Sequence, residues 1–201
     1  GRLCWLTALP GLSGATLRIF YSFMVPIFGG RRWTAVSTAS LLIPAIGIGF
    51  AVQDTATPYS LFVLLALLGG LGGGNFASSM ANITYFFPKK EKGNALAINA
   101  GLGNLGVSTM QFLVPIVITF SLFGSLAGAP QTAGDKTLWV QNAGFVWVPF
   151  IIASTMAAWF GMNDIADAKA SLRSQMAIFK RKHNWIMCFS YIGTFGSFIG
   201  L

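Results

Sequence analysis

The chain has 201 residues, of which 54% are hydrophobic and only 9% are charged, and its mean hydropathy is +0.67. A soluble domain carries about 25% charged residues, so this composition excludes a water-soluble globular fold. It also excludes intrinsic disorder, because unfolded chains are poor in the aromatic residues that make up 14% of this sequence. The formal net charge of +8 does not indicate nucleic-acid binding, since the basic residues form short clusters between apolar runs. A polytopic membrane protein remains.

Six apolar runs are long enough to cross a membrane as helices. A hydrocarbon core about 30 Å thick needs roughly 20 apolar residues per helix. We therefore expect an all-α fold, in which the long third and fourth runs tilt or project into water. The predicted spans are, in chain order, Trp5 to Phe28, Trp33 to Val52, Tyr59 to Phe87, Asn94 to Gly124, Gly144 to Met162 and Asn184 to Leu201.

The connections between these spans differ sharply in charge. Ten of the thirteen Lys and Arg residues lie in the first, third and fifth connections, whereas the second and fourth hold only Lys136. Short cytoplasmic loops carry such an excess, so the three basic connections are predicted to be cytoplasmic. The fifth connection, Asn163 to His183, is predicted to lie along the membrane surface, since it combines basic residues with an apolar stripe. The stripe consists of Ile165, Leu172, Met176 and Phe179.

The first apolar run begins almost at Gly1, without an initiator methionine or a signal peptide, so we expect an internal fragment. Cys4 and Cys188 lie in apolar stretches at opposite ends and lack metal-binding spacing. We therefore expect neither a metal nor another cofactor.

Arg18 is the residue that points most directly to function. A guanidinium near the bilayer centre costs about 2.5 to 3.5 kcal/mol on insertion scales. We interpret Arg18 as the contact for an anionic substrate, and pairing with an acid outside this sequence is the alternative. All the acidic residues of the chain lie outside the predicted spans: Asp54, Glu91, Asp135, Asp164 and Asp167.

Several candidate groups lie at a similar depth in the membrane. At a rise of 1.5 Å per residue, Arg18, Asn104, Phe76 and Phe195 are each about 15 to 17 Å from the cytoplasmic ends of their helices. Tyr191 precedes Phe195 by one turn on the same helix face. A cation, an amide and aromatic rings near the midplane are what a transport site for a small flat anion requires.

Two further patterns favour contacts between helices. Polar stripes on the third and fourth spans are interpreted first as hydrogen bonding between helices, with a ligand site as the alternative. Glycines at 69–74, with Gly101, Gly103 and Gly106, predict helices packed backbone to backbone. The GxGxxG pattern at 101–106 lies inside a predicted span and does not indicate a nucleotide site. The stripes consist of Asn75, Ser78, Ser79 and Asn82, and of Asn104, Ser108 and Gln111.

Several segments resemble a known transporter family. The sequences GNFASSMANI at 74–83, FFPKK at 86–90 and AGLGNLGVS at 100–108 closely resemble the nitrate/nitrite porters of the major facilitator superfamily. The last is similar to that family's nitrate signature. LSGATLR at 12–18 resembles the family's second transmembrane helix, and GGRR at 29–32 stands where the superfamily has a basic loop.

The resemblance implies a major facilitator-like protein of twelve helices in two bundles, of which this chain supplies helices 2 to 7. Residues 1–162 would form part of the N-terminal bundle, 163–183 the cytoplasmic segment between bundles, and 184–201 the start of the C-terminal bundle. It also implies that Arg18 contacts the anion and Asn104 hydrogen-bonds it. By the same resemblance, Phe76, Tyr191 and Phe195 enclose the anion.

The leading hypothesis is an inner-membrane transporter that exchanges nitrate and nitrite by alternating access. It would be no enzyme, would bind no cofactor or nucleic acid, and would work in the lipid bilayer as a monomer at full length. Exchange is favoured because the six predicted spans contain no Asp, Glu or His. The alternatives are a nitrate/proton symporter of the same fold, an anion channel, and a membrane-embedded redox or enzyme subunit. The single His lies in a loop, which argues against haem ligation in such a subunit.

Overall fold

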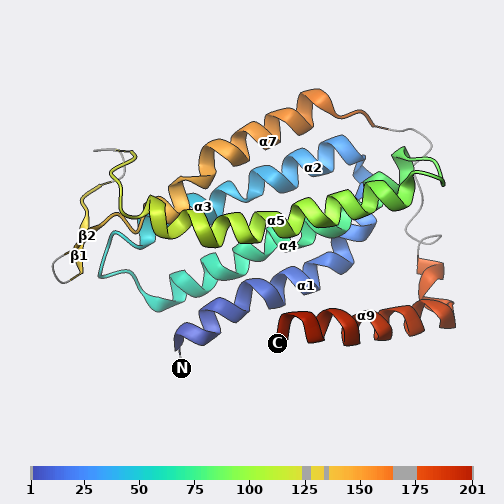
Figure 1. Ribbon diagram of the computed structural model, residues 1–201, viewed down its shortest axis with the longest axis horizontal. Coiled ribbons are helices and arrows are strands. Elements are labelled where there is room, and N and C mark those ends of the chain that lie inside the picture. Colours follow the sequence, from blue (N-terminus) through green and yellow to red (C-terminus); the bar gives the residue numbers. More distant parts are fainter. Residues whose placement is uncertain (1, 124–127, 134–135, 165–175, 201) are drawn as a thin grey trace.

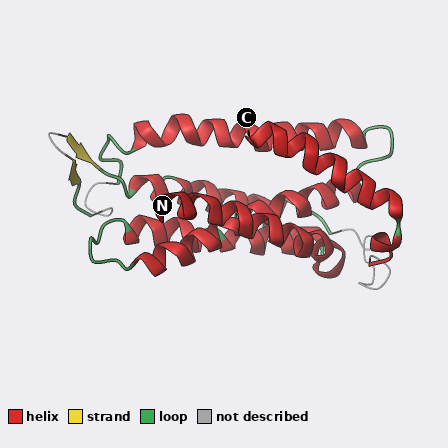
Figure 2. Cartoon of the chain, turned by 90° about the horizontal axis from the view of Figure 1, so that it is seen from below, coloured by secondary structure: helices red, strands yellow, loops and turns green. Residues whose placement is uncertain are grey.

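The computed structural model describes residues 2–123, 128–133, 136–164 and 176–200, and among these it describes the side chains except at 2, 133, 191–192 and 194–200. Long helices run side by side, and successive membrane-length segments of the chain reverse direction, so that the neighbouring helices α1 and α4 point the same way (Figures 1 and 2). The elements are α1 (Arg2–Phe28), α2 (Gly30–Ser40), α3 (Leu42–Ala51), α4 (Tyr59–Phe86), α5 (Lys92–Val117), β1 (Gln131–Ala133), β2 (Lys136–Leu138), α6 (Asn142–Phe145), α7 (Trp147–Gly161), the 3₁₀ helix η3 (Met176–Lys180) and α9 (Lys182–Gly200).

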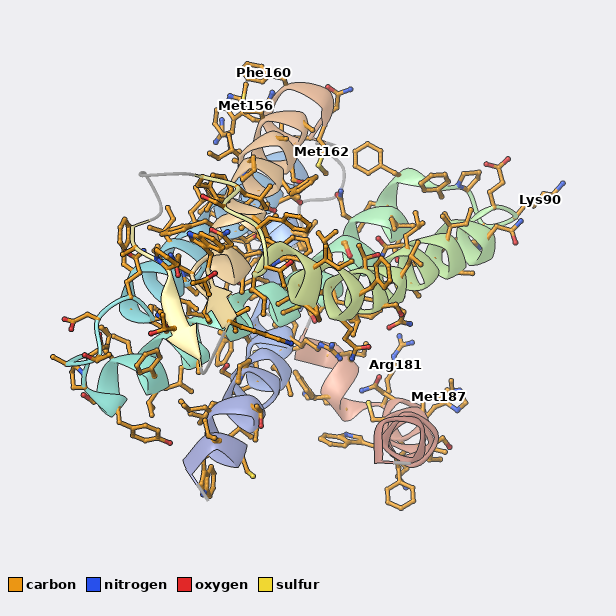
Figure 3. All side chains as sticks on the ribbon, turned by 60° about the vertical axis from the view of Figure 1, so that its left-hand side comes forward. Lys90, Met156, Phe160, Met162, Arg181 and Met187 are labelled. Carbon is orange, nitrogen blue, oxygen red and sulfur yellow. The ribbon has the colours of Figure 1, made fainter. Side chains whose placement is uncertain are left out.

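Within the described residues, five segments are helical, long and apolar enough to cross a membrane. Their outer surfaces carry apolar side chains, such as Met156 and Phe160 on α7, which are 54% and 79% exposed (Figure 3). The prediction of an all-α, multi-pass membrane protein is confirmed. The sixth predicted span, Asn184 to Leu201, falls on α9, which is not among the five membrane-length segments. The last residue of that predicted span, Leu201, lies outside the described residues. The five segments are Leu3–Phe28, Gly30–Ala51, Tyr59–Phe86, Lys92–Val117 and Asn142–Gly161.

Prolines set several of the helix boundaries. The second predicted span is broken at Leu41, because Pro44 has no N–H to donate to the carbonyl of Ser40. Helix α4 ends at Phe86, since Phe87 precedes Pro88 and takes an extended conformation with φ −100° and ψ 137°. The second predicted span is therefore present as Gly30–Ala51, with a break at Leu41.

The fourth predicted span is shorter than expected, because α5 ends at Val117. Beyond it, the fully buried amides of Gln141 and Asn142 bind backbone carbonyls: Gln141 Nε2 donates to Ala129 O at 3.1 Å and Asn142 Nδ2 donates to Phe120 O at 2.8 Å. A short antiparallel hairpin, β1 with β2, lies in the same connection. This hairpin was not predicted from the sequence, since strands of three residues show too little periodicity to detect.

Helices α1 and α4 pack with their backbones in close contact. A Cβ on Gly14 would lie 3.2 Å from the carbonyl oxygen of Gly70, and one on Gly73 would lie 3.0 Å from the Cα of Gly14. The hydroxyl of Ser13 also donates to Leu67 O at 2.9 Å. The predicted backbone-to-backbone packing is confirmed for Gly70 and Gly73, whereas Gly72 and Gly74 face the side chains of Leu41 and Tyr21.

The glycines of α5 do not pack in this way against the other described helices. Within the described part of the chain, nothing lies within 4 Å of a Cβ built on Gly101, Gly103 or Gly106. Residues 101–112 are all exposed, because this part of α5 stands away from the other described helices.

The turns at the basic end of the bundle bring two segments together. The α1–α2 turn, the α4–α5 turn and the end of α7 lie at one end, and the β hairpin lies at the other (Figure 1). At the basic end, Asp164 accepts a hydrogen bond from the backbone N–H of Arg31 at 2.8 Å and pairs with its Nε at 3.6 Å. The Arg31 guanidinium also lies 5.7 Å from the ring centre of Trp159. These contacts tie the α1–α2 turn to the end of α7.

Candidate functional site

A cavity of about 710 Å³ opens between α1, α2, α4 and α5, and we call it the central cavity. Its volume falls within the range of about 300–1,000 Å³ that ligand pockets occupy. The lining is polar for a membrane-embedded site and combines one cation with amides, hydroxyls and a single aromatic ring. The lining residues are Arg18, Thr34, Thr38, Gly72, Gly73, Asn75, Phe76, Ser78, Ser79, Asn99, Ala100, Leu102, Gly103, Asn104 and Val107.

Arg18 is half-buried on α1, and α4 fixes its orientation. Its Nε donates to the carbonyl oxygen of Gly73 at 3.1 Å, and its guanidinium carbon lies 5.3 Å from the ring centre of Phe76. Among the described residues its two terminal nitrogens have no hydrogen-bond partner, and the one ion pair found there joins Arg31 to Asp164. The guanidinium therefore presents a positive charge and a planar pair of donors to the central cavity.

Asn104 and Phe76 reach the same cavity from different helices. Phe76 lies on α4, one turn beyond Gly73, and Asn104 lies near the middle of α5 with an exposed side chain. Both residues were predicted to lie at the depth of Arg18, and the structure brings all three to one cavity. Ser108 and Gln111, which share a stripe with Asn104, do not line it.

The structure adds polar residues that the sequence analysis did not select. Asn99 lines the central cavity and its Nδ2 donates to Ser79 Oγ at 3.1 Å, which joins α5 to α4. Thr34 and Thr38 contribute from α2. Their spacing of four residues within an apolar span was a usable signal, because it places two hydroxyls on one helix face.

Two predicted site residues cannot be placed against the cavity. Tyr191 and Phe195 lie on α9, but their side chains fall outside the described residues.

The polar stripe on α4 was predicted to hydrogen-bond to other helices, and its residues differ in this respect. Ser79 hydrogen-bonds to α5, as expected for contact between helices, whereas the Oδ1 of Asn75 is buried without a hydrogen-bond partner.

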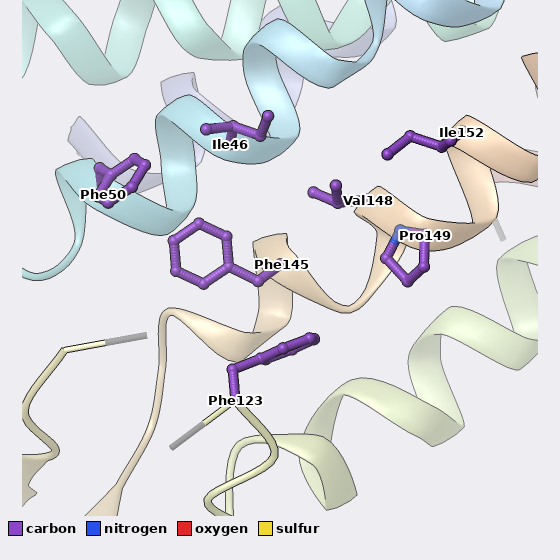
Figure 4. A pocket seen from close by; sticks show the side chains of 7 residues that line it. All are labelled: Ile46, Phe50, Phe123, Phe145, Val148, Pro149 and Ile152. Atoms are coloured by element: carbon purple, nitrogen blue, oxygen red, sulfur yellow. The ribbon is translucent and has the colours of Figure 1, made fainter. Parts of the chain in front are cut away.

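A second cavity of about 400 Å³ lies near the other end of the bundle, between α3, α6, α7 and the segment after α5 (Figure 4). It has no titratable side chain and no side-chain hydrogen-bond donor, so it offers nothing to an anion. Its lining consists of Ile46, Phe50, Phe123, Phe145, Val148, Pro149 and Ile152.

The side chains that line the central cavity match the chemistry of a small anion of flat shape. An Arg fork binds two oxygens of an oxyanion at once, which a Lys ammonium does not reproduce. A neutral amide adds a donor without adding charge, and an aromatic face covers a planar group. Nothing in this set of side chains is arranged as a nucleophile or as an acid–base pair.

Comparison with known proteins bears directly on this arrangement. The chain is 56% identical over 201 residues to the nitrate/nitrite transporter NarU of Salmonella typhimurium, with 99% of this chain and 43% of the relative covered. It is 54% identical to NarU of Escherichia coli with the same coverage. It is also 50% identical over 204 residues to a probable nitrate/nitrite antiporter, NarK2, of Thermus thermophilus, with 99% of this chain and 46% of the relative covered.

The resemblance to the nitrate/nitrite porters is confirmed. The chain is similar to these transporters over nearly its whole length and spans less than half of theirs. No family model matches the chain. The division into 1–162, 163–183 and 184–201 and the substrate roles of the five site residues stay predictions.

Proposed function

We propose that the protein is an inner-membrane transporter that exchanges nitrate and nitrite by alternating access around the central cavity. It performs no chemical reaction on its substrate and works as a monomer at full length. The names of its relatives support the substrate class, since two are called nitrate/nitrite transporters and a third a probable nitrate/nitrite antiporter.

The main support for the proposal is that the charge of the Arg18 guanidinium has no counter-charge among the described residues. Its Nε is held by Gly73 O, and among the described residues no carboxylate neutralises its charge. A cation in a low-dielectric cavity is costly without a counter-charge. A monovalent oxyanion supplies that charge and accepts the free N–H groups in one planar contact.

Asn104 and the aromatic ring of Phe76 complete the proposed contacts. The amide of Asn104 donates a neutral hydrogen bond to the anion from α5. Phe76 holds the guanidinium by a cation–π contact at 5.3 Å and presents an apolar surface that excludes water from the bound anion. Tyr191 and Phe195 would close the site from the helix after the basic segment.

Exchange follows from the energetics of an empty site. When an anion is bound, the charge and donors of Arg18 are satisfied and the cavity can close. The empty cavity must close around an uncompensated cation, which slows the return of an unloaded carrier. The sequence places no Asp, Glu or His in the predicted spans, so this part of the protein offers no proton carrier for symport.

The test is transport by the full-length protein in liposomes. Nitrate uptake should be slow into empty liposomes and at least tenfold faster when nitrite or nitrate is inside. A pH gradient alone should drive no accumulation. Accumulation driven by the pH gradient would establish a symporter, and fast uptake without dependence on internal anion would establish a channel.

A further inference from the structure

A third cavity, separate from the central one, lies at the basic end of the bundle, and we call it the inner pocket. It has a volume of about 400 Å³ and lies between α1, η3 and α9. It shares no lining residue with the central cavity. Its lining is mainly apolar, with two polar side chains, and consists of Ile19, Ser22, Phe23, Ile178, Phe179 and Asn184.

Aromatic contacts hold the short helix η3 against α1. The rings of Phe23 and Phe179 have their centres 6.2 Å apart, and the rings of Phe179 and Trp185 have theirs 6.3 Å apart. The indole Nε1 of Trp185 donates to the carbonyl oxygen of Phe179 at 2.9 Å. The turn from η3 into α9 is therefore a defined structure that forms one wall of the inner pocket.

Three cations follow this wall directly in the sequence. Lys180, Arg181 and Lys182 are exposed, and among the described residues none of them pairs with a carboxylate. Figure 3 labels Arg181 beside α9, and η3 lies at the same end of the bundle as the α4–α5 turn in Figure 1. Trp185, 59% exposed, is of the type that gathers where headgroups meet hydrocarbon.

We propose that the inner pocket and the three cations together form a binding site for one anionic phospholipid of the inner leaflet. The phosphate binds Lys180, Arg181 and Lys182, and an acyl chain enters the pocket against Phe23, Ile178 and Phe179. Asn184 lies among the lining residues and can donate to the glycerol ester region, whereas the hydroxyl of Ser22 already donates to Arg18 O at 2.7 Å.

Charge complementarity and the apolar lining both select this ligand. Basic clusters next to membrane helices attract anionic lipid headgroups. A zwitterionic lipid would fill the apolar pocket but gain little from three cations. Free phosphate would bind the cations but leave the apolar walls of the inner pocket in contact with water. The cations and the apolar pocket together therefore fit one amphipathic molecule.

The test measures lipid binding to the purified full-length protein in detergent by native mass spectrometry. Phosphatidylglycerol is titrated against phosphatidylcholine with the same acyl chains. We expect the triple variant Lys180→Gln, Arg181→Gln, Lys182→Gln to lose the preference for phosphatidylglycerol by roughly 100-fold, given the attraction of each cation near an anionic surface. The matched control is Lys89→Gln, Lys90→Gln, Lys92→Gln, which removes the same charge from the α4–α5 turn and should keep the preference.

Two more variants separate the headgroup from the acyl chain and guard against misfolding. Lys180→Arg with Lys182→Arg keeps the charge and should bind phosphatidylglycerol within twofold of the unmodified protein. Ile178→Asn should weaken both lipids about equally, since it places an amide in the pocket. Millimolar inorganic phosphate should not displace the lipid.

Three results would overturn the proposal. One is an equal loss in the Lys89, Lys90, Lys92 control, which would mean a general charge effect. Another is full displacement by inorganic phosphate, which would make the cations a free-phosphate site. The third is an unchanged preference in the triple variant. Each of these results is distinct from a failure of the proposed transport function, because the lipid-binding assay does not depend on nitrate transport.

Discussion

Arg18 and Phe76 lie on different helices, yet the guanidinium carbon of Arg18 is 5.3 Å from the centre of the Phe76 ring. The carbonyl that accepts from Arg18 Nε belongs to Gly73, one turn before Phe76 on α4. One turn of α4 therefore sets both the position and the plane of the guanidinium. The glycine is needed there, because a Cβ on Gly73 would lie 3.0 Å from the Cα of Gly14 on α1.

The first prediction concerns the charge and shape of Arg18. Arg18→Gln should reduce nitrate binding and counterflow at least 100-fold, since it removes the charge from the central cavity. Arg18→Lys keeps the charge but loses the planar fork, so it should reduce both about tenfold. Nitrate counterflow in liposomes measures the effect, with Arg32→Gln as a control at the exposed helix end. Near-normal counterflow by Arg18→Gln would place the anion site elsewhere.

The second prediction concerns Asn104. Asn104→Leu replaces an amide that lines the central cavity with an apolar group of similar size, so the Michaelis constant for nitrate should rise about tenfold through the lost donor. Gln111→Leu is the matched control, since Gln111 is exposed on the same helix and does not line the cavity. If both variants transport nitrate normally, Asn104 is only a surface residue of α5.

The sequence predicted the depth of Arg18, Phe76 and Asn104 because charge fixes the ends of the helices and the helical rise is constant. It could not predict which faces meet. Asn99 was passed over because its partner, Ser79, lies on another helix twenty residues earlier, and only packing shows that pairing. The helix end next to Pro88 was predictable from local geometry. The end of α5 was not, since the carbonyl of its last residue, Val117, accepts from Asn142, a residue distant in sequence, at 3.4 Å.

The third prediction concerns membrane topology. In a protein whose Cys4 and Cys188 are replaced by Ser, cysteines introduced at Lys90 and Arg181 should react only with reagent on the cytoplasmic side. A cysteine at Lys136 should react only from outside, because it lies on the hairpin at the opposite end of the bundle (Figure 1). Membrane-impermeant thiol labelling of intact cells makes the measurement. Labelling of Lys90→Cys from outside would reverse the orientation.

The fourth prediction concerns the contact of α1 with α4. Gly70→Ala should destabilise the folded protein by about 1–3 kcal/mol, because the new Cβ would meet Ser13 and lie 2.6 Å from the backbone nitrogen of Gly14. Gly11→Ala is the control on α1, since nothing described lies within 4 Å of its Cβ. Thermal unfolding in detergent compares the two. Equal stability of both variants would mean that the α1–α4 contact is looser than described.

The last prediction separates three effects that meet at Asp164. Its carboxylate accepts a hydrogen bond from the backbone N–H of Arg31 at 2.8 Å and pairs with the Arg31 Nε at 3.6 Å. It also lies close to Gly29, since a Cβ built on Gly29 would be 2.6 Å from the Oδ1 of Asp164. The side chains of the pair are 37% and 32% exposed, so the ion pair itself contributes little in water.

Asp164→Asn keeps an oxygen for the Arg31 N–H and should therefore cost less than about 1 kcal/mol of stability. Asp164→Ala removes that acceptor from the start of α2 and should cost about 1–2 kcal/mol. Gly29→Ala should cost most, because Gly29 has a φ of +91° and the added Cβ would also displace Asp164. Thermal unfolding in detergent at low and high salt measures all three. Two results together would contradict this prediction: the stability of the unmodified protein depends strongly on salt but that of Asp164→Asn does not, and Asp164→Asn loses as much stability as Asp164→Ala. They would show that the ion pair, and not the backbone hydrogen bond, holds the α1–α2 turn to the end of α7.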